Sequence, residues 1–114
     1  MENIDVIYRH VGDASFYWSQ IDKISYSNTV TIDGVLNFEK ILTAHLDGVI
    51  EANRIGWDIS LNQLERWRGA GEIFVCSFIA LSSPPELSLP KWKIIEKILI
   101  ADPYRMLRGV VSAI

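Results

Sequence analysis

Two histidines and one cysteine are the side chains of this sequence with the most versatile chemistry. Neither His10 nor His45 has a partner at the i, i+4 spacing of a helical zinc site. The single Cys76 excludes an internal disulfide and a cysteine-rich zinc site. A small hydrolase built on a Cys76–His45 dyad is conceivable, but no flanking signature accompanies these residues. We therefore expect no catalytic residue, metal or cofactor, and we interpret Cys76 as a small buried hydrophobic residue.

The sequence has no clear feature for binding phosphate groups or nucleic acid. Gly69-Ala70-Gly71 lacks the preceding strand and the following lysine of a phosphate-binding loop. The formal net charge is −3, and the first 57 residues hold eight acidic against four basic side chains. Because nucleic-acid binding requires basic stripes, this balance argues against it. A mildly acidic half is compatible with a basic protein partner.

The elements that must position these groups are predicted to be helices. Apolar residues recur three and four positions apart, which places them on one helix face. The first helix has a possible break at Gly12–Asp13, because glycine is unfavourable within a helix. The predicted helices span residues 4–21, 31–53, 57–68, 72–81, 90–101 and 103–114.

Glycine and proline define most of the predicted boundaries. We expect Gly56 to end the second helix in a left-handed conformation, and Gly69 to end the third. Trp57 and Trp67 are predicted to point inward from that third helix. Pro90 suits the first position of the fifth helix, after a rigid linker at residues 82–85.

Residues 72–81 are apolar on nearly every side, so periodicity alone cannot distinguish a central helix from a buried strand. We favour a helix because every neighbouring element is helical. The predicted fold is all-α, with one domain over residues 1–114. It is a compact bundle or short stack of about six antiparallel helices, like HEAT-type helical hairpins. We expect a cytoplasmic protein, without membrane association, because the start lacks a signal-peptide pattern and no apolar run is long enough for a membrane span.

Aromatic and acidic side chains outside the core stripes are the candidates for contact with a partner. Aromatic residues dominate binding hot spots, although burial against the chain's own helices is the alternative for each. Asp47 and Glu51 lie four residues apart and form a small acidic pair. The candidate partner-binding residues are Tyr17, Asp22, Tyr26, Asp47, Glu51 and Trp92.

Three stretches resemble the opening of a proteobacterial HEAT-repeat-like family. They are His10 with Asp13-Ala14-Ser15-Phe16-Tyr17-Trp18, then Thr43-Ala44-His45-Leu46-Asp47-Gly48, then Ile55-Gly56-Trp57. The resemblance covers residues 8–81, and larger members continue into further helical repeats. Many members are encoded near type VI secretion spike and effector genes. The resemblance implies an immunity protein that neutralises a toxic effector, or an adaptor that loads one.

The family motif is expected to have a structural role, in which its side chains fix helices to one another. Its residues in this sequence are His10, Trp18, His45, Asp47, Gly48 and Trp57. The predicted function is a non-catalytic protein-binding module whose partner is an effector or a secretion component. The alternatives are a structural domain that forms homo-oligomers through its last helix and, in third place, the Cys76–His45 hydrolase.

Overall fold

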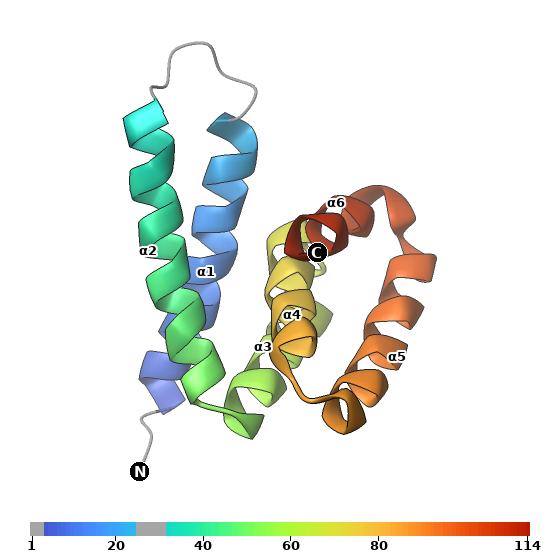
Figure 1. Cartoon of the computed structure of the whole chain (residues 1–114). Helices are drawn as coiled ribbons and strands as arrows, with labels where there is room; N and C mark the ends of the chain where they lie inside the picture. The colour runs from blue at the N-terminus through green and yellow to red at the C-terminus, as the bar shows by residue number, and fades with distance from the viewer. Residues whose placement is uncertain (1–3, 25–31) are drawn as a thin grey trace.

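The computed structural model describes residues 4–24 and 32–114, and these residues form six α-helices (Figure 1). No strand occurs within these two ranges, so the all-α prediction is confirmed. The helices are α1 (Ile4–Ile24), α2 (Ile32–Glu51), α3 (Arg54–Trp67), α4 (Ala70–Ser82), α5 (Pro85–Ala101) and α6 (Pro103–Ala113). Over the same residues, no helix combines the length and apolar character that crossing a membrane requires.

Helices α1 and α2 lie side by side as a long hairpin (Figure 1). The possible break at Gly12–Asp13 does not occur, because α1 continues through both residues. The helix is continuous because α1 and α2 bury apolar side chains against each other, and this burial outweighs the helix propensity lost at one glycine. The buried apolar residues of the hairpin are Ile7, Val11, Ala14 and Trp18 of α1 and Leu42, Leu46 and Val49 of α2.

Helix α4 is the centre of the molecule, which confirms that residues 72–81 are helical. One side of α4 contributes Phe74, Val75 and Ile79 to a core cluster shared with α1, α2 and α3. Another side contributes Ile73 and Cys76 to a second cluster, shared with α3, α5 and α6. Because α4 packs on both sides, it needs apolar residues all round, and a one-sided periodicity is absent.

Two helix ends differ from the glycine-based prediction. The residue with positive φ after α2 is Asn53, at 56°, and the residue after α3 is Arg68, at 49°. Asparagine tolerates the positive-φ region better than most residues do. Gly56 instead lies inside α3, where an added Cβ would lie 2.2 Å from the carbonyl oxygen of Val49. Its small size, rather than its backbone freedom, lets α3 approach the end of α2.

The predicted start of the fifth helix is also wrong, because α5 begins at Pro85 and Pro90 lies inside it. Pro85 occupies the first-turn position that we assigned to Pro90, where a missing N–H has no cost. The backbone N–H groups of Leu87 and Ser88 both donate to the carbonyl of Pro84, which establishes the first turn. The linker between α4 and α5 is therefore only two residues long.

Trp67 does not point inward as predicted, since 59% of it is exposed. It is the last residue of α3, and its indole N–H donates to Gln63 of the same helix at 3.1 Å. The buried residues of α3 are Gly56, Ile59, Ser60 and Leu64.

Candidate functional site

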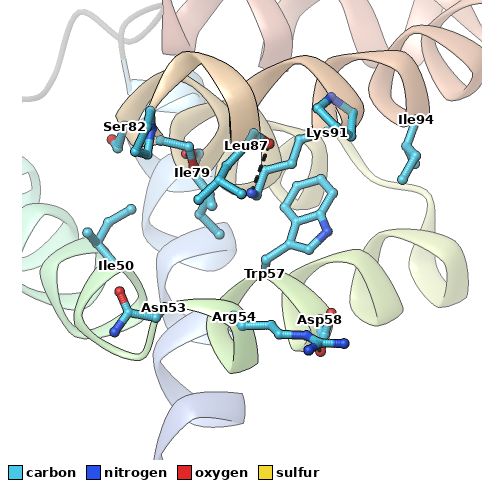
Figure 2. Close-up of a pocket in the computed structure, with 13 residues that line it drawn as sticks. Ile50, Asn53, Arg54, Trp57, Asp58, Ile79, Ser82, Leu87, Lys91 and Ile94 are labelled. Carbon is cyan, nitrogen blue, oxygen red and sulfur yellow. Dashed lines mark hydrogen bonds and ion pairs between the residues drawn. The ribbon is translucent and has the colours of Figure 1, made fainter.

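A groove of about 720 Å³ separates α3 from α5 (Figure 2). Both helices pack against α4, but they make no close backbone approach to each other. The buried side chain of Ile79 on α4 therefore lies between them, and Ile50 at the end of α2 lines the same hollow. The opening between helices that share a common support is a frequent location for a binding site.

Trp57 forms one wall of the groove. Its half-buried ring packs against both core clusters and extends from α3 toward Lys91 of α5 (Figure 2). The Lys91 ammonium lies 5.5 Å from the centre of the ring, within the range of a cation–π interaction. It also donates a hydrogen bond of 3.1 Å to the carbonyl of Leu87. Within residues 4–24 and 32–114, no carboxylate forms an ion pair with Lys91.

The edge of the groove on α3 carries charge. Arg54 and Asp58 lie one helical turn apart, with 3.9 Å between the guanidinium Nε and the carboxylate. Both side chains are exposed, so this pair contributes little to stability and its members can exchange partners. With Lys91 on the other wall, the groove combines an apolar floor with two cations and one anion. This arrangement suits an apolar segment that carries an acidic side chain.

A second constellation lies in the α1–α2 hairpin, where two histidines meet. The Nδ1 atoms of His10 and His45 are 3.0 Å apart, and Nε2 of His45 lies 3.7 Å from a carboxylate oxygen of Asp13. Tyr17 stacks on His45 with 5.7 Å between ring centres and 15° between ring planes. When the Nε2–H of His45 is directed at Asp13, its Nδ1 accepts the hydrogen bond that His10 donates.

Gly48 completes this histidine pair. A Cβ at this position would lie 2.7 Å from Cδ2 of His10, so only glycine leaves room for the ring. Two of the three stretches that carry the family resemblance, distant in sequence, thus meet on one side of the hairpin through His10, Asp13, Tyr17, His45 and Gly48. The described parts of the chain contain no cluster of three or more His, Cys, Asp or Glu side chains suited to a metal ion. The geometry is that of a structural contact that holds α1 and α2 together.

The remaining residues of the family motif lie elsewhere. Trp18 is buried and stacks on Phe74 of α4, with 5.6 Å between ring centres. Trp57 lines the α3–α5 groove, and Asp47 is exposed on α2.

Two aromatic residues expected at the surface are engaged within the chain. Tyr17 is half-buried against the first cluster and His45, so the expectation that it points off the core is wrong. Trp92 is half-buried against the second cluster, which is the alternative that the sequence left open. Tyr26 lies outside the described residues.

The predicted acidic residues divide into two groups. Asp22 forms an ion pair with Arg108 that joins α1 to α6. Asp47 and Glu51 are both exposed on α2, as an acidic contact surface would require. Of the predicted partner-binding residues that the structure describes, none lines the groove.

Cys76 has the opposite character to an activated nucleophile. Its side chain is fully buried in the second cluster, whereas His45 belongs to the hairpin and hydrogen-bonds to His10. Burial raises the pKa of the Cys76 thiol, and the carboxylates of Glu72 and Glu65 raise it further. A reactive cysteine needs a lowered thiol pKa and access to solvent.

Comparison of the chain with protein-family models, with curated proteins and with solved structures finds no match.

Proposed function

We propose that this chain is a non-catalytic protein-binding module and that the α3–α5 groove is its binding surface. The observation that supports this most directly is the wall formed by Trp57 beside a lysine with no carboxylate partner among the described residues. Tryptophan is the residue type most enriched in binding hot spots. An apolar hollow with charged edges is a common receptor for a peptide segment.

The partner that fits best is an amphipathic helix or extended segment with apolar anchors and one acidic side chain. The anchors would cover Leu87 and the exposed part of the Trp57 ring, which removes apolar surface from water. The acidic side chain would approach Lys91, where a neighbouring aromatic face and a partly dehydrated setting favour a charge-assisted hydrogen bond.

The resemblance of residues 8–81 suggests the biological setting. We propose that the module is an immunity protein that neutralises a type VI secretion effector, or an adaptor that loads one. The exposed Asp47 and Glu51 on α2 would provide a second contact if that effector is basic.

The test compares two leucines of α5 that differ in one respect. Leu87 lines the groove and is 55% exposed, whereas Leu89 is 61% exposed and does not line it. We expect Leu87→Glu to lower the affinity for the effector encoded beside the gene at least tenfold, by titration calorimetry. Lys91→Glu should do the same, and Leu89→Glu should retain affinity.

Growth of cells that express the effector gives the functional readout. Coexpression of the unmodified chain or Leu89→Glu should restore growth, and Leu87→Glu should not. Equal affinity of all three variants would refute the groove as the binding surface. Absence of any complex with the effector would refute the immunity and adaptor roles.

A further inference from the structure

Helix α6 presents a second apolar surface, distinct from the groove. One side of α6 packs on α4 through Met106, Gly109 and Val110, which are buried. Gly109 marks the crossing point, where an added Cβ would lie 2.2 Å from the carbonyl oxygen of Ala70. Four further large apolar residues of this helix and its C-cap are more than half exposed, and we call them the α6 stripe: Tyr104, Leu107, Val111 and Ile114.

The spacing of the α6 stripe is that of a helix that packs against another helix. Its members follow one another by three, four and three residues, which is the a/d spacing of a coiled-coil seam. Scattered exposed apolar residues are ordinary on a protein surface, but a contiguous row on one helix marks an interaction surface.

The charges beside the stripe are neutralised within the chain. Arg105 pairs with Asp102 at 3.7 Å, and Arg108 pairs with Asp22 of α1. Two copies of α6 can therefore approach without the repulsion that unpaired guanidinium groups would cause. The four side chains of the stripe are uncharged, so two stripes can pack together without placing like charges in contact, unlike the groove, where Lys91 has no carboxylate partner among the described residues.

We propose that the α6 stripe is a homodimer interface, in which a second copy packs its own stripe against the first across a two-fold axis. Self-complementary surfaces of this kind form two-fold dimers most often. The four side chains expose on the order of 550 Å² in each copy, or about 1,100 Å² for the pair, near the lower limit of specific interfaces. The dimer should accordingly be weak and reversible.

Sedimentation equilibrium of the full chain tests this proposal. The apparent mass should rise from that of one chain, 13.0 kDa, toward twice that value as the concentration increases. Leu107→Glu should weaken the association at least tenfold. The matched control is Leu36→Glu on α2, because Leu36 is 55% exposed and Leu107 is 53% exposed.

A cross-linking variant supplies an independent readout. Val111→Cys places a thiol on the stripe, and oxidation should yield a covalent dimer, while the buried Cys76 of the parent chain should not react. Circular dichroism confirms that each variant retains its helices. A mass of one chain up to about 1 mM, or association that Leu107→Glu and Leu36→Glu weaken equally, would overturn the proposal. These results do not depend on the effector, so they are separable from the test of the groove.

Discussion

The Nδ1 atoms of His10 and His45 lie 3.0 Å apart across the α1–α2 interface, so one imidazole donates a hydrogen bond that the other accepts. This bond joins residues 35 positions apart and is flanked by Asp13 and Tyr17. Partly buried side-chain hydrogen bonds contribute modest net stability, but they cost more when one partner is removed. The pair should therefore stabilise the hairpin as a unit.

A double-mutant cycle measures this coupling. We expect His10→Ala and His45→Ala each to lower the free energy of unfolding by about 1–2 kcal/mol. The double variant should lose less than the sum of the two, with a coupling of about 0.5–1.5 kcal/mol. Urea denaturation of the four proteins gives these values. Strict additivity would show that the two rings stabilise the hairpin independently.

Substitution by alanine at Gly48 and at Gly12 should change the stability of the protein in opposite directions. Gly48→Ala should lower the free energy of unfolding by about 1–3 kcal/mol, because the new Cβ would meet the ring of His10. Gly12→Ala meets no atom within 4 Å and should raise it by about 0.5–1 kcal/mol through helix propensity. Thermal melts monitored by circular dichroism should shift in opposite directions. A common direction for both variants would contradict the steric explanation.

Buried serines offer a way to stabilise the core. The hydroxyl groups of Ser15, Ser60 and Ser77 are buried without a hydrogen-bond partner among the described residues. Ser77→Ala should raise the free energy of unfolding by about 1 kcal/mol or more, since it removes an unsatisfied polar group and improves helix propensity. The control is Ser19→Ala, whose hydroxyl donates to the carbonyl of Ser15. Chemical denaturation should show a smaller gain for Ser19→Ala than for Ser77→Ala.

The buried thiol of Cys76 should make the stability of the protein depend on pH in the alkaline range. Because the folded protein raises the pKa of the thiol, it holds that proton more tightly than the unfolded chain does. The associated stability is complete below the ordinary thiol pKa of about 8.5, and it declines as the pH rises above that value. Cys76→Ala should flatten this alkaline decline in urea titrations at pH 7 to 10. Native Cys76 should also alkylate far more slowly than the denatured thiol, and a rapid native reaction would reopen the hydrolase hypothesis.

The helices themselves were predictable because their signals are local. The spacing in α1 and α2 identifies the faces that pack in the hairpin, and Pro103 correctly indicates the start of α6. The errors at Gly56 and Pro90 have one origin. Glycine and proline each permit more than one role, and the choice between them depends on what lies nearby in space.

The groove could not be predicted in the same way. It exists because α3 and α5 both pack on α4 while their backbones stay apart, and no periodicity encodes that separation. Leu87 and Lys91 therefore carry no distinguishing sequence signal, although Trp57 belongs to one of the stretches that carry the family resemblance. The contact between His10 and His45 is likewise a property of how α1 and α2 align, which the sequence spacing alone does not specify.

Helix α4 joins the two core clusters, and this has a consequence for how the molecule melts. If α4 unfolds, both core clusters become exposed to water, because each of them includes residues of α4. The chain should thus denature in one all-or-none step rather than by halves. A ligand that binds both α3 and α5 should accordingly raise the melting temperature of the distant α1–α2 hairpin by as much as that of the helices that form the groove.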